Sequence, residues 1–195
     1  MPRTGEAVGR APSDVRERIL ETAYELFSRR GIRGVGVDEV IERAGVAKAT
    51  LYRHFPSKDD LVVAFLELRE ERWTRGLLEA EARRLGAGPE EQLLALFDVL
   101  DAWFRRDDFE ACSFINVLLE LGPQHPAGRA AVDHLANIRS LVRELAEEAG
   151  LRDPAAFAYS HQILMKGSII SAAEGDADAA RRARAIARLL IEQYR

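Results

Sequence analysis

Residues 37–58 read VDEVIERAGVAKATLYRHFPSK and decide the fold of the chain. Apolar residues at helical spacing predict two short helices, over residues 37–44 and 48–54, with Gly45 opening a tight turn between them. Two short helices joined by a glycine-containing turn are typical of the helix-turn-helix. Small or polar residues at the start of the second helix suit a helix that enters the major groove of DNA. An ordinary pair of helices in a bundle would give the same apolar pattern.

The charge of the chain is distributed unevenly around this stretch. The whole sequence carries 28 Lys and Arg against 32 Asp and Glu, a formal net charge of −4. Residues 43–58 instead hold Arg43, Lys48, Arg53 and Lys58 with no acidic residue. Local positive charge on an acidic protein favours contact with the phosphates of a nucleic acid, although a solvated basic face has the same composition.

The remainder of the chain also has the periodicity of helices. Ser57 and Asp60 form a capping signal, and nothing interrupts the helix that follows before Gly86. We expect a first helix ending before Gly31 and later helices over about residues 57–85, 89–106, 109–121 and 126–149, with two more at the C-terminus. The chain is therefore predicted to be all-α, with about nine helices and no strand.

Composition excludes several classes of protein. The longest run without Asp, Glu, Lys or Arg has twelve residues, Pro154 to Met165, and a membrane-spanning helix needs about 20. Residues 1–14 contain no apolar stretch that resembles a secretory signal. The single cysteine, Cys112, cannot form an internal disulfide. We expect a soluble, cytoplasmic protein.

No set of residues predicts catalysis or metal binding. The glycines of residues 31–36 resemble a phosphate loop, but they follow a helix rather than a strand and lack the Lys-Ser/Thr ending. The four histidines show no metal-ligand spacing. A metal site from Glu120, His125 and His134 stays an alternative that the spacing does not favour. We expect no enzyme, no metal and no cofactor.

Residues 17–62 resemble the DNA-binding domain of the TetR/AcrR family of bacterial transcriptional regulators. The run AGVAKATLYRHFPSK, residues 44–58, is the most specific part of the match. The other matching positions are Ile19, Leu20, Ala23, Leu26, Phe27, Gly31, Val37 and Leu61. The resemblance implies a flexible N-terminal arm over residues 1–12, a three-helix DNA-binding domain over 13–57, and a helical ligand-binding and dimerisation domain over 58–195.

The resemblance also implies roles for individual residues. Lys48, Ala49, Thr50 and Tyr52 would line the recognition helix, and Tyr52 and Lys58 would grip phosphates. The chain departs from the family pattern because Gly36 and Ala47 replace two hydroxyl residues, and Ile41 replaces a small residue. Arg53 and His54 are candidates to compensate for the missing hydroxyls. The predicted DNA-binding set is Gly36, Ala47, Lys48, Ala49, Thr50, Tyr52, Arg53, His54 and Lys58.

A ligand site is predicted in the C-terminal domain. Cys112, Asn116 and Glu120 form a polar stripe on an otherwise apolar helix, which suits the few polar groups of a ligand cavity. A solvent-facing stripe is the alternative for these three residues, and plain core is the alternative for the predicted walls. The walls are predicted from Phe65, Trp73, Phe97, Leu100, Trp103 and Phe104.

These features together predict a homodimeric repressor that binds double-stranded operator DNA and is released by a small, largely apolar effector. An apolar stripe on each of the last two helices is predicted to form the dimer interface. It comprises Phe157, His161, Leu164, Met165, Ser168 and Ile169, and then Ala179, Ala183, Ile186, Ala187, Leu190 and Ile191. The alternatives are a helical ligand-binding or scaffold protein that no longer binds DNA, and a small helical enzyme that uses Glu120 or a histidine.

Overall fold

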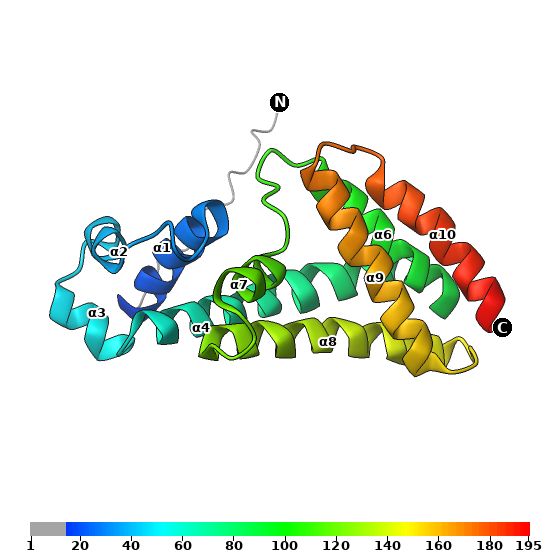
Figure 1. The fold of residues 1–195 in the computed structure, drawn as a ribbon, viewed down its shortest axis with the longest axis horizontal. Helices are drawn as coiled ribbons and strands as arrows, with labels where there is room; N and C mark the ends of the chain where they lie inside the picture. The colour runs from blue at the N-terminus through cyan, green and yellow to red at the C-terminus, as the bar shows by residue number, and fades with distance from the viewer. Residues whose placement is uncertain (1–14) are drawn as a thin grey trace, which may run out of the picture. The chain divides into compact units, whose positions relative to one another are not determined.

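The computed structural model describes residues 15–195, which are helical apart from short connections (Figure 1). The helices are α1 (Val15–Arg30), α2 (Val37–Ala44), α3 (Lys48–His54), α4 (Lys58–Arg69), the π-helix η1 (Glu70–Glu79), α5 (Ala80–Leu85), α6 (Pro89–Phe104), α7 (Ser113–Leu121), α8 (Pro126–Glu148), α9 (Pro154–Ala173) and α10 (Ala179–Tyr194). Because α4, η1 and α5 are continuous, this part of the chain has nine helices and no strand. The all-α prediction is confirmed. The predicted arm, residues 1–12, lies outside the described residues.

The chain divides into two compact units, one ending at Phe65 and the other covering Leu66–Arg195. The first two turns of α4 therefore belong to the first unit, whereas the sequence predicted a boundary after Ser57. Phe65 explains the difference, because its ring packs edge-on against Tyr24 at 5.5 Å and Phe27 at 5.6 Å between ring centroids. These contacts extend the core of the first unit along α4.

The first unit is built around the turn between α2 and α3. Gly45 has φ +61°, a left-handed conformation that costs glycine little. Its N–H donates to the carbonyl of Glu42 at 3.1 Å, and the N–H of Val46 donates to Ile41 at 3.2 Å. These two bonds form a Schellman motif, which satisfies the last carbonyls of α2. The predicted bounds of both helices, 37–44 and 48–54, are confirmed.

The core of the second unit surrounds α6. Its side chains Leu93, Leu96, Phe97 and Leu100 are fully buried, and α5, η1, α8, α9 and α10 all pack against this helix. His161 of α9 lies between aromatic rings in this core, and its Nε2 is 3.1 Å from the carbonyl oxygen of Leu93. Burial lowers the pKa of His161 to about 4. The imidazole is therefore neutral and donates its Nε2–H to that carbonyl.

Helix α7 begins at Ser113, four residues after the start predicted from the sequence. Ala111 has φ +59°, which a residue with a Cβ rarely adopts and which ends any helix from Phe109 onward. Phe109 instead packs on Trp103 and Phe104, at 4.9 Å and 5.0 Å between ring centroids. The aromatic contacts hold this segment outside the helix.

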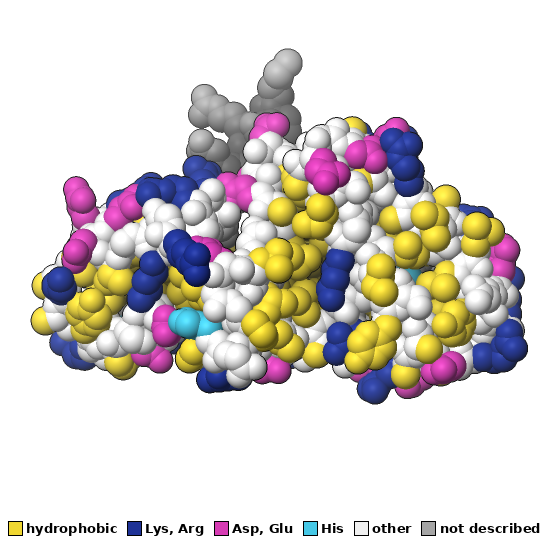
Figure 2. All heavy atoms as spheres, viewed as in Figure 1, with side chains coloured by type: hydrophobic (Ala, Val, Ile, Leu, Met, Phe, Trp, Pro, Cys, Tyr) yellow, Lys and Arg dark blue, Asp and Glu magenta, His cyan; other side chains and the backbone are white. Residues whose placement is uncertain are grey.

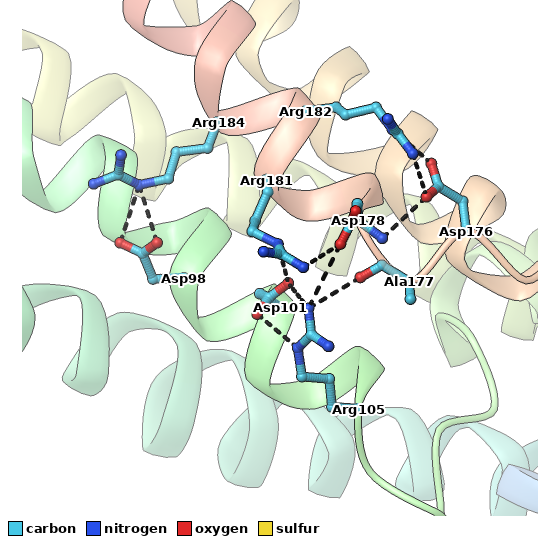
Figure 3. Close-up of polar contacts among 9 residues, drawn as sticks. All are labelled: Asp98, Asp101, Arg105, Asp176, Ala177, Asp178, Arg181, Arg182 and Arg184. Atoms are coloured by element: carbon cyan, nitrogen blue, oxygen red, sulfur yellow. Dashed lines mark hydrogen bonds and ion pairs between the residues drawn. The ribbon is translucent and has the colours of Figure 1, made fainter.

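Charged side chains connect the end of α6 to the start of α10 (Figure 3). Asp98 pairs with Arg184 at 3.0 Å, and Asp101 lies between Arg105, at 2.9 Å, and Arg181, at 3.8 Å. Because most of these side chains reach solvent, the individual pairs add little to stability. No helix within residues 15–195 is long and apolar enough to cross a membrane.

Nine of the twelve residues in the predicted apolar stripe of α9 and α10 face the interior of the protein, whereas Ile186 is exposed and Leu164 and Leu190 are half-buried. The buried members are Phe157, His161, Met165, Ser168 and Ile169 of α9 and Ala179, Ala183, Ala187 and Ile191 of α10. These residues pack within one protomer, so their assignment to a dimer interface is wrong. The exposed large apolar residues of the two helices (Figure 2) are Ile186, which the predicted stripe included, and four that it did not, namely Tyr159, Ile163 and Ile170 of α9 and Leu189 of α10. These five residues are called the outer apolar face below.

Candidate nucleic-acid interface

Helix α3 is anchored by one buried side chain and exposes four others. Leu51 is fully buried against the first unit, whereas Lys48, Ala49, Tyr52 and Arg53 are exposed. Because positions i and i+4 of a helix lie on the same face, Lys48 and Tyr52 form one row and Ala49 and Arg53 form the adjacent row. The half-buried residues Thr50 and His54 flank these rows. The structure thus brings the predicted recognition residues together on a single solvent-facing surface.

Two of the three residues that depart from the family pattern, Gly36 and Ala47, are the N-caps of α2 and α3. Gly36 and Ala47 have extended backbone conformations, and neither supplies a side-chain acceptor for the N–H groups that follow. Serine, threonine, asparagine or aspartate at such a position accepts one of these N–H groups. The start of the recognition helix therefore lacks both a capping oxygen and a hydroxyl that donates to phosphate.

Lys58 is bound to the backbone of its own unit. Its ammonium donates to the carbonyl oxygens of Ile32 and Val35, both at 2.6 Å. These carbonyls lie in the connection between α1 and α2, so Lys58 fixes that connection to the first turn of α4. Because an ammonium has three protons, only one is left for a phosphate. This geometry gives Lys58 a positioning role that the sequence did not predict.

The cations of the exposed face are weakly held. Lys48 pairs with Asp38 at 3.2 Å, with 65% and 84% of the two side chains exposed. An ion pair this exposed contributes little to stability and exchanges readily for another anion. Within the part of the chain that the structure describes, Arg53 forms no ion pair or hydrogen bond. Both side chains are thus available to the phosphates of DNA.

Comparison with known proteins agrees with this geometry. Residues 19–65 match the family model described as bacterial regulatory proteins, tetR family. A TetR-family transcriptional regulator of known structure from Streptomyces coelicolor is 30% identical and superposes with a TM-score of 0.82, covering 92% of this chain and 95% of that one. The chain belongs to the TetR family of transcriptional regulators. Its DNA-binding domain is the helix-turn-helix described above.

Two curated relatives each match about a third of this TetR-family chain. The transcriptional activator FasR of Mycolicibacterium smegmatis is 40% identical over 72 residues, which is 36% of this chain and 33% of FasR. The transcriptional repressor KstR of Rhodococcus jostii is 45% identical over 62 residues, 32% of this chain and 29% of KstR. The chain thus spans about a third of the length of these relatives. The reduced form of Escherichia coli NemR, 22% identical with a TM-score of 0.78, shares the fold.

The structure disperses the ligand residues predicted for this TetR-family chain. Phe65 lies in the core of the first unit, which does not support its predicted place along a cavity. Trp73, Trp103 and Phe104 do meet, with 4.8 Å between the two indole centroids and 5.7 Å from Trp103 to Phe104. The fully buried Phe97 and Leu100 lie on α6, where Phe97 contacts His161.

The polar stripe predicted on α7 does not point in one direction. Cys112 is the buried N-cap of this helix, and burial raises the pKa of its thiol. Asn116 is exposed and donates to the carbonyl of Glu110 at 3.4 Å, while Glu120 is half-buried. Asn116 therefore follows the alternative prediction of a solvent-facing residue.

A buried polar cluster joins η1 to α8, and the sequence did not reveal it. Glu70 is 6% exposed, and Nδ2 of Asn137 donates to its two carboxylate oxygens at 2.8 Å and 3.1 Å. Nδ1 of His134 lies against Oε2 of the same carboxylate, and the ring of Phe114 stacks on the imidazole at 5.0 Å. Burial lowers the pKa of His134, so a neutral imidazole lies against the carboxylate at neutral pH. We call Glu70, His134 and Asn137 the helix cross-link.

The helix cross-link lies at the start of a rare secondary structure. Glu70 begins η1, and π-helical turns with i→i+5 hydrogen bonds frequently occur at functional sites. In the same segment, Nε1 of Trp73 and Oγ1 of Thr74 are buried without a hydrogen-bond partner among the described residues. Each orphaned group of this kind costs about 1–3 kcal/mol. Segment 70–79 is therefore the part of the long helix whose buried polar side chains are least well hydrogen-bonded.

Proposed function

We propose that the chain is a repressor that binds a pseudo-palindromic operator as a homodimer and is released by a small-molecule effector. The observation that carries this proposal is the outward side of α3. Leu51 packs this helix against its own unit, and the outward side presents Lys48, Ala49, Thr50, Tyr52 and Arg53. A recognition helix needs a tightly packed inner side and available side chains on its outer side, because the edges of DNA bases are read only by groups that enter the groove.

The roles of the DNA-facing residues follow from their chemistry and exposure. Lys48 and Arg53 supply charge to phosphates, and Tyr52 and Thr50 supply hydroxyl donors. Ala49 is the small residue that allows α3 to approach the bases closely. Gly36 and Ala47 contribute only backbone N–H groups at the starts of α2 and α3. His54 lies at the end of α3, where its ring N–H groups are within reach of the DNA backbone.

The outer apolar face supports dimerisation through α9 and α10. Its side chains are 44% to 68% exposed, although all five are large and hydrophobic. Contiguous exposed apolar residues mark interaction surfaces, and a two-fold dimer would place each of them against a second copy. A dimer is also what the DNA geometry requires, because two half-sites lie about 34 Å apart, one helical turn of DNA.

Effector control would act through the long helix that begins at Lys58. This helix starts in the DNA-binding unit and carries Glu70, whose carboxylate is bound by His134 and Asn137 of α8. An effector that contacts η1 or competes for the helix cross-link changes how the long helix is held. Useful control requires a difference of about 1–3 kcal/mol between the two states of such a regulator. Trp73 belongs to η1, and Trp103 of α6 packs against it. The fluorescence of both side chains should therefore report effector binding.

The direct test of the proposed function is selection of genomic DNA fragments with the purified protein. We expect a discrete palindromic site, protected over two half-sites, and a loss of selection in the double variant Lys48→Ala, Tyr52→Ala. The matched control is Arg188→Ala, which removes an exposed cation from α10. If no sequence is enriched at low salt, the chain is instead a ligand-binding or scaffold protein that has lost DNA binding, and the proposal is wrong.

A further inference from the structure

A groove between α8 and α9 has the chemistry of an anion site. Its volume is about 230 Å³, and it is lined by Ala136, Arg139, Ser140 and Arg143 of α8 and Ala155, Ala158 and Tyr159 of α9. The polar groups of this lining are two guanidinium groups and two hydroxyls, all of which can donate hydrogen bonds. No acidic side chain lines the groove, although the chain as a whole carries a net charge of −4.

Arg139 is held in place by neutral partners only. Its Nη1 donates to Oε1 of Gln162 at 3.1 Å, and its guanidinium lies 4.4 Å from the ring centroid of Tyr159. Gln162 is itself 3% exposed and donates from Nε2 to the carbonyl of Leu135 at 2.6 Å. The guanidinium is therefore positioned by a buried amide and an aromatic ring, while most of its N–H groups stay unused.

Positive charge accumulates around this guanidinium without compensation. Lys166 lies one helical turn beyond Gln162, and burial together with the charge of Arg139 lowers its pKa. Among residues 15–195, no carboxylate pairs with Arg139 or Lys166. Arg143 pairs with Glu147 at 3.5 Å on the exposed side of α8, so the uncompensated charges are those of Arg139 and Lys166. Like charges held together without a counter-charge are unfavourable, and a bound anion relieves that cost.

We propose that this groove binds an oxyanion group, a carboxylate or phosphate carried by a small molecule. The guanidinium of Arg139 would bind two oxygens of the group side by side, the geometry that arginine offers to carboxylates and phosphates. Arg143 would supply the second charge, and the hydroxyls of Ser140 and Tyr159 would donate to the remaining oxygens. The site is argued from one protomer alone, so it stands or falls independently of DNA binding.

The test is titration calorimetry with sodium phosphate and sodium acetate, each at constant ionic strength set with sodium chloride. We expect at least one of the two oxyanions to bind with one site per protomer, and the stronger binder to identify the group that the site prefers. Losing a charge-assisted hydrogen bond costs about tenfold or more in affinity. Arg139→Gln and Arg143→Gln should each weaken binding by that factor, whereas Arg188→Gln, an exposed arginine of α10, should leave it within twofold.

Two results would overturn the proposal. The first is binding of both oxyanions no tighter than chloride, or equally tight in the wild type and in Arg139→Gln. The second concerns the position of Tyr159 on the outer apolar face. If Arg139→Gln weakens the dimer in sedimentation experiments while neither oxyanion binds, the groove receives an acidic side chain of a second copy instead. Circular dichroism of each variant shows whether its helices are intact.

Discussion

Truncation of Ile163 is the sharpest test of the outer apolar face. Ile163 is 68% exposed in the protomer, and burying an isoleucine side chain fully is worth about 1.5–3 kcal/mol. Burial of the exposed part in a dimer is thus worth about 1–2 kcal/mol per copy. A two-fold interface contains the residue twice, so Ile163→Ala removes about 2–4 kcal/mol, which corresponds to a roughly 30- to 700-fold weaker dimer.

The assay is sedimentation equilibrium over a wide range of protein concentration, which gives the dimer dissociation constant of each variant. Leu119→Ala is the matched control, because Leu119 is 77% exposed on α7, outside the outer apolar face. Ile191→Ala tests the inward stripe: Ile191 is 2% exposed, so its truncation should cost about 2–5 kcal/mol of folding stability. A dissociation constant for Ile163→Ala within threefold of the Leu119→Ala value would show that α9 does not form the interface.

Three further outcomes are expected. Lys58→Ala should cost about 1–3 kcal/mol in urea unfolding, because two carbonyls lose their partner. It should change the salt dependence of operator binding less than Arg53→Gln, which should lower that slope by about 1 per subunit. Ala47→Ser should stabilise the protein by about 1 kcal/mol, and Gly36→Ser by only a few tenths, in thermal unfolding. The pKa of His161 is about 4 against 6.5 in an unfolded chain, so the unfolded state binds more protons between these values. Stability should be full above pH 6.5 and should fall by up to about 3 kcal/mol as the pH drops to 4. His161→Gln should lack this loss, and parallel curves for variant and wild type would contradict the assignment.

The sequence predicts the DNA-binding unit well because its determinants are local. Gly45 fixes the turn, the residues around it fix the ends of α2 and α3, and one buried position, Leu51, decides which face of α3 points outward. Each of these signals lies within a few residues of the structure that it specifies. Lys58 is the exception in this unit, because the carbonyls that bind it belong to residues 23 and 26 positions earlier in the chain.

The second unit was less predictable because its polar contacts are distant in sequence. Glu70 meets Asn137 across 67 positions, and neither residue stands out from its neighbours on the helix. The π-helix around Glu70 has no sequence signature either, since residues 70–79 continue a helical pattern without glycine or proline at the start. The late start of α7 depends on the contact between Phe109 and Trp103. Such features are settled by tertiary packing rather than by local propensity.

Apolar residues lie on both the inner and the outer side of helix α9. Its inner residues, such as Phe157 and Ile169, and its outer residues, such as Ile163 and Ile170, are equally apolar, so the sequence cannot say which row faces the core. A helix that is hydrophobic all round must be buried on more than one side. One protomer buries only the inner row, which leaves the outer row to a further surface. The apolar outer row of α9 thus both obscures the core-facing row in the sequence pattern and supports a dimer through this helix.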